Sequence, residues 1–364
     1  MGVYVGVTLG QALAAPGTDS VAARVSEWAR AQGLGFVVTG LEQLQYDLHP
    51  PKVGGTPDTG LLRQGSSNGA RTSASRTVGA TAGRTAVPRV PVHAALTPVA
   101  SPALPGEGVF RPVVTPHGMP AVQVAYLRPD ASHTSYLAAV AWMSSRLLRF
   151  VQHPGYADPG HLGLWSQPDS VSRERAGLVA TFNSGFKMAD SRGGYYDNGH
   201  TLGALRAGAA SFVVYRDGHV AIGAWGRDVS MARDVVSVRQ NLRLIVEGGR
   251  PAPNLETRVQ SNWGATLGGA YFVWRSGVGI TATGDLVYVT GNALSAHTLA
   301  DLLRRAGAVR AMELDINPAW ISYMWYAPAS TPGQVVPTKI LPFARPADRY
   351  LAPTSRDFVA VYAR

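Results

Sequence analysis

The stretch of sequence that decides the fold is residues 309–320, VRAMELDINPAW. Side chains alternate between the two faces of a β-strand. One face of this segment therefore carries Arg310, Met312, Leu314 and Ile316, and the other carries Val309, Ala311, Glu313 and Asp315. The alternation predicts a β-strand over residues 309–316, followed by a turn at Asn317-Pro318.

The segment just before this strand predicts a helix. Ser295 is a suitable N-cap, and Gly307 is a suitable stop signal. One apolar stripe at helical spacing lies between them, formed by Leu299, Leu302, Leu303 and Ala306. We therefore expect a helix that leads directly into the strand at residues 309–316.

The rest of residues 106–364 is rich in strand and hairpin signals. The turn at Asp217-Gly218 separates the apolar runs 211–215 and 219–222, and Thr283-Gly284 separates residues 279–282 from 286–289. Residues 136–151 fit either strands or a helix, and the interruption at Ser144-Ser145 favours strands; residues 177–180 and 242–246 are also expected strands. With 41 Gly and 25 Pro, the chain is unsuited to a helical bundle. We expect an α+β domain with a twisted, mixed and largely antiparallel sheet and a few packing helices.

Three regions follow from the changes in composition along the 364 residues. Residues 1–52 form an N-terminal extension, with an expected helix over 19–33 and a strand near 36–38. The uncharged start of this extension is either the stub of an export or anchor segment or an apolar strand. Residues 53–105, poor in acidic side chains and rich in Ser, Gly and Pro, predict a flexible linker. Residues 106–364 form the main domain.

Composition excludes several classes of function. The net charge of +10 comes mainly from scattered arginines, because only Lys52, Lys187 and Lys339 are lysines, and this pattern argues against specific nucleic-acid binding. The absence of cysteine removes disulfides and thiolate chemistry. The nine histidines lack metal-binding spacing, so we expect no metal and no organic cofactor.

The carboxylates of Glu313 and Asp315 are the strongest candidates for catalysis. Their spacing of two places them on one strand face at the strand's C-terminal end. Two neighbouring carboxylates perturb each other's ionisation, so one can hold a proton while the other acts as a base. The alternative is that Glu313 faces solvent while Asp315 caps the turn at 316–318.

Two further segments carry candidate binding residues. Asn183 and Lys187 follow the strand at 177–180 among small residues, and Lys187 offers a compact cation for a phosphate. Arg275 opens a hairpin and has the geometry to clamp a phosphate with two hydrogen bonds. Each of these cations is alternatively an ordinary surface charge. Trp320, Tyr323 and Trp325 form either a sugar-stacking platform or part of the sheet packing.

Five landmarks in this order resemble the phosphodiester glycosidase family over roughly residues 177–325. They are Asn183-Ser184-Gly185-Phe186, Arg275-Ser276-Gly277-Val278-Gly279, Thr283-Gly284-Asp285, Thr298-Leu299-Ala300-Asp301-Leu302 and Ala311-Met312-Glu313-Leu314-Asp315. The sequence departs from the family pattern at Glu313, where the family usually has Asn. Residues 316–320 also replace the Gly-rich run of the family, whose backbone amides can approach an anion.

The resemblance implies an enzyme that hydrolyses a sugar-1-phosphodiester. Asp315 and Glu313 then divide the acid and base roles, Arg275 and Lys187 bind phosphate, and Asn183 orients a sugar hydroxyl. Ser276, Asn317 and Glu247 are further candidates for substrate binding, although the position of Glu247 in a strand-terminal turn favours a structural role.

We expect the protein to be extracytoplasmic, secreted or tethered to a membrane through an upstream segment. Its expected substrate is a cell-envelope glycan such as a teichoic-acid-like polymer. Two hypotheses compete with this one. The first is a non-catalytic module that binds wall glycans or polyanions with the same fold. The second is an ordinary glycosidase that uses the same carboxylates, for which Arg275 is irrelevant.

Overall fold

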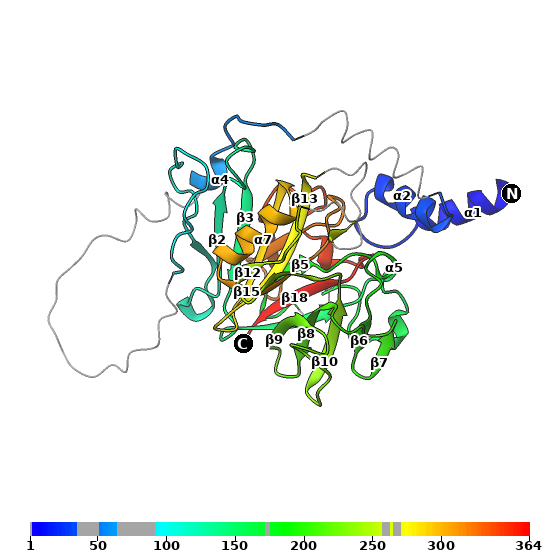
Figure 1. The fold of residues 1–364 in the computed structure, drawn as a ribbon. Helices are drawn as coiled ribbons and strands as arrows, with labels where there is room; N and C mark the ends of the chain where they lie inside the picture. The colour runs from blue at the N-terminus through cyan, green and yellow to red at the C-terminus, as the bar shows by residue number, and fades with distance from the viewer. Residues whose placement is uncertain (1, 35–50, 64–91, 172–174, 257–262, 265–270) are drawn as a thin grey trace.

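The computed structural model describes residues 2–34, 51–63, 92–171, 175–256, 263–264 and 271–364. Within these residues the chain forms three β-sheets, short helices and connecting loops (Figure 1). Every pairing between the named strands of the described chain is antiparallel. The predicted α+β class with a largely antiparallel sheet is confirmed, although the strands are divided among three sheets.

The largest sheet, called here the large sheet, contains the strand predicted at residues 309–316. Its order is β1 (Arg111–Val114), β2 (Val122–Leu127), β3 (Ala138–Met143), β14 (Leu286–Leu294), β13 (Val273–Thr281), β15 (Ala308–Glu313), β11 (Leu244–Glu247) and β12 (Arg250–Pro251). The β13–β14 and β3 predictions are confirmed, and β15 ends at Glu313, slightly before the predicted boundary. Asp315 therefore lies two residues beyond the end of β15.

Two five-stranded sheets complete the domain. The second sheet has the order β17 (Val335–Lys339), β16 (Tyr323–Pro328), β5 (Leu178–Asn183), β18 (Phe358–Ala363) and β4 (Leu148–His153). The third sheet has the order β7 (His200–Leu202), β6 (Tyr195–Asp197), β10 (Val235–Gln240), β8 (Ala210–Tyr215) and β9 (Val220–Ala224). The predicted Asp217-Gly218 hairpin is the β8–β9 connection.

The helices are few and short. They are α1 (Gly2–Leu13), α2 (Val21–Ala31), α4 (Gly60–Arg63), α5 (Met188–Ser191) and α7 (Ala296–Arg305), with 3₁₀ turns at η2 (Pro116–Gly118), η3 (Leu162–Leu164) and η5 (Arg349–Leu351). The predicted N-cap of α7 is confirmed, because Ser295 Oγ accepts a hydrogen bond from Thr298 N at 2.9 Å. The helix lies over the large sheet (Figure 1).

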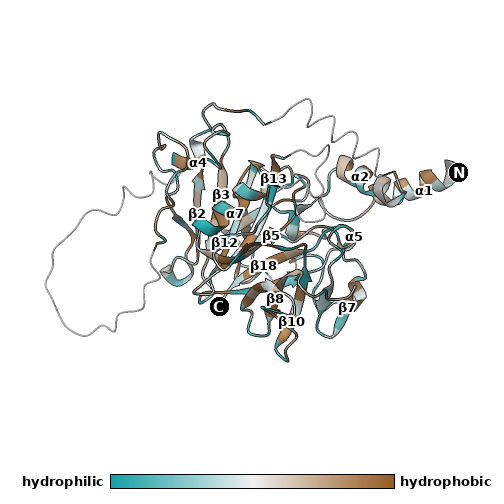
Figure 2. Cartoon of the chain, viewed as in Figure 1, coloured by the Kyte–Doolittle hydropathy of each residue, from teal (hydrophilic) through white to brown (hydrophobic). Residues whose placement is uncertain are grey.

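Two apolar layers hold the sheets together. Leu299, Leu302 and Leu303 of α7 pack on one face of the large sheet. The other face packs against the second and third sheets, and Phe182 of β5 lies where they meet, 5.4 Å from the ring of Tyr288 and 6.4 Å from that of Phe212. Figure 2 shows hydrophobic residues in these strands and hydrophilic residues in the outer turns. The ends of β5 and β15 are thereby fixed between packed layers.

The N-terminal extension differs in part from its prediction. The helix expected over 19–33 is α2, with Ser20 Oγ accepting from Ala23 N at 3.2 Å. Residues 2–13 form the helix α1, so the alternative of an apolar strand is wrong. The strand expected near residues 36–38 lies outside the described residues. Among the residues that the structure describes, no helix is long and apolar enough to cross a membrane.

The described ends of the predicted linker pack against the domain. Leu62 and Leu96 are buried, Leu62 in the core between the sheets and Leu96 in the cluster around α7. Gly108 accounts for part of this contact, because a Cβ on it would lie 2.0 Å from Leu96 O. The interior of the predicted linker, residues 64–91, lies outside the described residues. The predicted division of the chain at residues 53 and 106 stays a prediction.

The packing of α7 generates a test of the fold. Leu303 is fully buried between α7 and the large sheet, so Leu303→Ala should lower the free energy of unfolding by about 2–5 kcal/mol. His297 is exposed on the same helix, and His297→Ala should change stability by less than about 0.5 kcal/mol. Urea unfolding followed by circular dichroism measures both variants. Equal stability of the two variants would contradict the packing described here.

Candidate active site

Residues Leu314 and Asp315, which follow β15, are hydrogen bonded to Ser276 of the neighbouring strand β13. Leu314 N donates to Ser276 O at 2.8 Å, and Ser276 donates from both its N and its Oγ to Asp315 O, at 3.2 and 2.8 Å. Glu313 and Asp315 are thus fixed at the C-terminal end of an interior strand, and the two residues are only 2% and 4% exposed. The alternative that Glu313 faces solvent is wrong.

Glu313 forms a buried ion pair with Arg275. Arg275 Nη1 lies 2.6 Å from Glu313 Oε1, and its Nε donates to Leu294 O at 2.9 Å. The other guanidinium contacts are to the carbonyl oxygens of Trp263 and Tyr271. Because each guanidinium nitrogen already has a partner inside the protein, this geometry argues against the predicted role of Arg275 in binding phosphate.

The burial of Glu313 has an electrostatic consequence. Loss of solvation and, to a smaller extent, the nearby Asp315 raise the pKa of Glu313 to about 7, against the opposing attraction of Arg275. Glu313 Oε2 is buried and has no hydrogen-bond partner among the described residues. The side chain is therefore able to exchange a proton near neutral pH.

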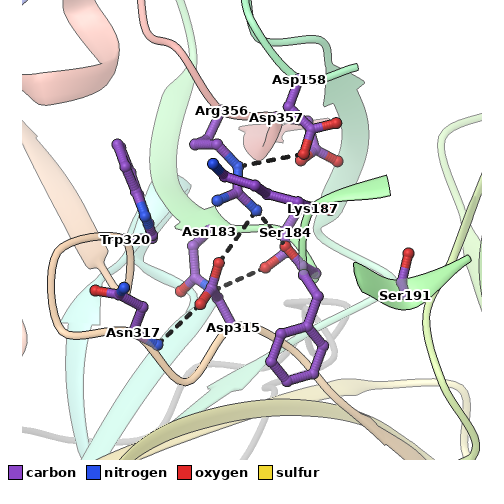
Figure 3. Close-up of polar contacts among 12 residues, drawn as sticks. Asp158, Asn183, Ser184, Lys187, Ser191, Asp315, Asn317, Trp320, Arg356 and Asp357 are labelled. Atoms are coloured by element: carbon purple, nitrogen blue, oxygen red, sulfur yellow. Dashed lines mark hydrogen bonds and ion pairs between the residues drawn. The ribbon is translucent and has the colours of Figure 1, made fainter. Parts of the chain in front are cut away.

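Asp315 is held by a different cation, Arg356, which precedes β18. Arg356 Nη2 donates to Asp315 Oδ2 at 3.2 Å, and Asn317 N donates to Asp315 Oδ1 at 2.8 Å. Burial raises the pKa of Asp315, while Arg356 and the backbone amides of Asn317 and Ile316 oppose the rise. Asp315 therefore makes the predicted turn-capping contact and also pairs with Arg356, as Figure 3 shows.

Sequence reasoning missed Arg356, which lies at the centre of the charged cluster in Figure 3. Besides Asp315, it contacts Gly185 O at 3.1 Å and Asp158, with Nε 3.6 Å from Asp158 Oδ2. Burial alone would lower the pKa of Arg356, but the neighbouring carboxylates, Asp315 first, raise it overall. No local motif marks this arginine, because its partners come from distant parts of the chain.

Asp357, the next residue, belongs to a second buried ion pair. Its Oδ2 accepts from Arg239 Nε at 2.7 Å and from Gln152 Nε2 at 3.3 Å. Burial raises the pKa of Asp357, and Arg239 opposes this shift. The two residues that precede β18 thus form two ion pairs. Arg356 pairs with Asp315 after β15, and Asp357 pairs with Arg239 of β10.

Asn183 and Ser276 were predicted to have polar groups free to bind substrate, but these groups are hydrogen bonded within the protein. Asn183 Oδ1 accepts from Tyr288 Oη at 2.8 Å and from Ser322 N at 3.1 Å. Asn183 Nδ2 donates to Ser276 Oγ at 3.0 Å and to Ser184 O at 2.9 Å. The amide has no remaining capacity for a sugar hydroxyl. We therefore reassign Asn183 and Ser276 as positioning residues for Asp315.

Lys187 and Asn317 are the predicted binding residues that remain beside Asp315 with partial exposure (Figure 3). The side chain of Lys187 is 24% exposed, and its ammonium pairs with Glu27 of α2. The half-buried Asn317 accepts from Ala319 N at 2.8 Å through its side-chain oxygen. Glu247 lies apart from this group, because β11 runs antiparallel to β15 and Val246 lies opposite Ala311, which places Glu247 toward the start of β15. Its side chain is exposed and pairs with Arg227 at 2.6 Å. The structure therefore argues against Glu247 as a substrate contact.

A carboxylate of the N-terminal extension, Asp19, pairs with Arg345 near the site. Asp19 Oδ1 lies 2.9 Å from Arg345 Nη1, and Asp19 Oδ2 accepts from Ser355 Oγ at 2.7 Å. Both side chains of the Asp19–Arg345 pair are at least 95% buried. Together with Glu27, Asp19 places two negative charges of the extension against positive charges beside the site.

Trp320 and Tyr323 are packing residues in this structure. The indole ring of Trp320 has three guanidinium groups near it, with centroid distances of 4.6 Å for Arg345 and 5.3 Å for both Arg349 and Arg356. Tyr323 is fully buried beside Phe182 and Tyr288. The sugar-stacking alternative does not apply to these two buried rings. Among the described residues, no cluster of three or more His, Asp or Glu side chains could hold a metal ion.

The comparison with protein families identifies the region that contains this site. Residues 175–315 match the family model of phosphodiester glycosidases. The matched region begins just before β5 and ends at Asp315, so it includes Lys187, Arg275 and Glu313. The match confirms the resemblance that the sequence motifs predicted. Arg356 lies beyond the matched residues.

Several solved structures resemble the chain at low identity. The catalytic domain of zebrafish N-acetylglucosamine-1-phosphodiester alpha-N-acetylglucosaminidase, auto-inhibited by its pro-peptide, is 13% identical, with a TM-score of 0.43 over 70% of this chain and 87% of that one. A hypothetical protein from Synechocystis is 11% identical, with a TM-score of 0.37 over 68% and 63%. A putative exported protein from Burkholderia pseudomallei is 12% identical, with a TM-score of 0.33 over 65% and 75%. No curated protein sequence matches the chain.

The raised pKa of Glu313 predicts how stability depends on pH. Between its ordinary value of 4.5 and about 7, the unfolded chain has released this proton while the folded chain retains it. Stability contributed by Glu313 is therefore present at low pH and is lost as the pH rises through this window. Replacing the side chain by Glu313→Gln should flatten that decline.

Denaturant unfolding at a series of pH values measures the slope for the wild type and for Glu313→Gln. Glu247→Gln is a matched control, because this exposed carboxylate should leave the slope unchanged. An equal slope in the wild type and Glu313→Gln would show that Glu313 titrates at its ordinary pKa.

Proposed function

We propose, from the family match over residues 175–315, that this chain hydrolyses a sugar-1-phosphodiester. The observation that carries the proposal is the pair of buried carboxylates at the end of β15, both with raised pKa values, beside the cations Arg356 and Lys187. In this reaction water adds across the bond between the sugar C1 and the phosphate oxygen. The water oxygen joins C1, and a proton is transferred to the released phosphate monoester.

The two carboxylates have different environments, which support different roles. Asp315 accepts hydrogen bonds from Arg356 and the Asn317 amide, and these contacts favour its ionised form. We assign it as the base for the attacking water. Glu313, whose pKa burial raises to about 7, is protonated in about half of the molecules at neutral pH, and we assign it as the proton donor. This pairing follows the division of acid and base roles in glycoside hydrolysis.

The anionic side of the substrate requires cations that are not fully committed to the protein interior. Arg275 is excluded from this role by its internal contacts, and Arg356 is equally buried and paired with Asp315 and Asp158, so we assign the partly exposed Lys187 to the phosphate. Asn317 lies beside Asp315 and is the remaining candidate for a sugar hydroxyl. Of the two cations predicted to bind phosphate, this assignment keeps Lys187 and drops Arg275.

We also propose that the substrate is a cell-envelope glycan with phosphodiester links, such as a teichoic-acid-like polymer, and that the protein acts outside the cytoplasm. The support is electrostatic. A net charge of +10 attracts a polyanion at long range and increases the rate of encounter at low ionic strength. The phosphodiester chemistry expected of the family is consistent with such a polymer.

The central test replaces Asp315 with Asn, which keeps the shape and removes the base. Hydrolysis of synthetic N-acetylglucosamine-1-phosphodiesters, followed by chromatography of the released sugar, should fall by about 100- to 10,000-fold. The matched control is Glu247→Gln, which should retain wild-type activity because Glu247 is exposed and apart from the site. Thermal unfolding checks that both variants are folded.

One outcome would favour the competing hypothesis of a non-catalytic module. If the wild type binds these diesters tightly without turnover, and Asp315→Asn binds them equally well, the enzyme assignment is wrong. Equal rates of hydrolysis by the wild type and Asp315→Asn would likewise remove Asp315 from the mechanism.

The ion pair between Lys187 and Glu27 can be tested with two variants that should change KM in opposite directions. If the phosphate replaces Glu27 on the ammonium, Lys187→Gln should raise KM for a phosphodiester about tenfold, whereas Glu27→Gln should lower it. A neutral glycoside of the same sugar is the control, and its KM should not change. Steady-state kinetics of both variants measures these values. A rise in KM for both variants would mean that the pair has only a structural role.

A further inference from the structure

Asp158, in the loop between β4 and β5, lies beside the residues that precede β18. Its N donates to Ser355 O at 3.0 Å and its O accepts from Asp357 N at 3.0 Å, so the two segments run side by side in parallel. Gly155 permits this close approach, because a Cβ on it would lie 2.5 Å from the backbone of Arg356. The main chain therefore fixes Asp158 next to Arg356.

The side chain of Asp158 contacts two segments of the candidate active site. Its Oδ2 lies 3.6 Å from Arg356 Nε and accepts a hydrogen bond from Met188 N at 3.1 Å. Met188 follows Lys187, whose own side chain caps no amide of α5. One carboxylate therefore joins the guanidinium beside Asp315 to the backbone beside Lys187 (Figure 3).

The contact with Arg356 matters because this guanidinium is buried. A buried cation is costly unless a negative charge lies beside it. Asp315 supplies such a charge at Nη2, whereas Nε, which makes no hydrogen bond among the described residues, lies 3.6 Å from Asp158. When Asp315 takes a proton from the attacking water, as proposed above, it becomes neutral. Asp158 then remains as a counterion of Arg356.

We propose that Asp158 is a positioning residue for the hydrolysis proposed above, and this inference rests on that function. Through Arg356, Asp158 keeps a guanidinium in contact with Asp315 while Asp315 gains and loses a proton. Through the amide of Met188, it fixes the backbone that carries Lys187, the residue assigned to the phosphate. Asp158 acts only through these neighbours and has no contact with the reacting atoms in this assignment.

The charge of Asp158 also acts on the ionisation of Asp315. Burial raises the pKa of Asp315, Arg356 opposes this rise, and Asp190 of α5 adds to it. Asp158 is a further negative charge on the same guanidinium, so its removal lowers the pKa of Asp315. The remaining charged groups around Arg356 and Asp315 are Asp357, Glu27 and Glu313. Because a base must be ionised, the acidic limb of the activity profile then moves to lower pH.

The experiment compares Asp158→Asn and Asp158→Ala in the full chain, with a synthetic N-acetylglucosamine-1-phosphodiester as substrate. Both variants remove the charge, so in both the acidic limb of kcat/KM should move to lower pH by about 0.5 or more. The asparagine keeps an oxygen that can accept from Met188 N, so its KM should stay within about twofold of the wild type. The alanine loses this hydrogen bond, and its KM should rise about three- to tenfold.

Asp217→Asn is the matched control, because it changes the net charge equally. Asp217 is exposed in the turn between β8 and β9 and pairs with His219. The pH profile and the KM of this variant should match those of the wild type. Thermal unfolding confirms that each variant is folded, so loss of structure cannot imitate loss of positioning.

A titration of the Asp315 carboxyl group by carbon-13 NMR, with its signal identified from Asp315→Asn, measures the same pKa without turnover. If the wild type hydrolyses no diester, the proposed function fails, and the titration still decides whether Asp158 acts on Asp315 through Arg356. The proposal is overturned if the pKa of Asp315 is the same in the wild type and both Asp158 variants. It is also overturned if Asp158→Ala keeps the KM of the wild type.

Discussion

The side-chain amide of Asn183 is the contact on which the arrangement of the candidate site depends. Its hydrogen bonds to Tyr288 and Ser276 reach the large sheet, while its own strand, β5, belongs to the second sheet. Ser276 in turn donates to Asp315 O. One satisfied amide therefore fixes both the distance between two sheets and the position of a carboxylate, and inside a protein such networks are strong because no water competes for them.

Local signals were sufficient to predict most of the fold. The Asp217-Gly218 and Thr283-Gly284 turns, the Ser295 cap and the alternation after Gly307 each depend on neighbouring residues, and each predicted element is present. The assignment of strands to three sheets could not be predicted in this way. It depends on which apolar faces pack together, and short-range patterns do not contain that information.

The site was predicted less completely than the fold, for the same physical reason. Asp315 and Glu313 could be found because they share one strand. Arg356, the cation beside Asp315, is 41 positions further along the chain and approaches only through the pairing of β18 with β5. Arg275 was identified as a cation near the site, but its pairing with Glu313 changes its role from a possible ligand contact to an internal partner. Which charged side chains remain free to contact a substrate therefore depends on ion pairs between residues that are far apart in the sequence.

The place of β18 in the second sheet has a consequence for how the protein is made. This strand lies between β5 and β4, and Arg356 and Asp357 immediately precede it. During synthesis, β5 and β15 leave the ribosome long before their neighbour exists, so the second sheet stays incomplete until residues 358–363 emerge. Until then Asp315 lacks its hydrogen bond from Arg356, and an edge of β5 is open. No nascent fragment that ends before Arg356 can therefore assemble the charged cluster, whatever part of the large sheet it has already formed.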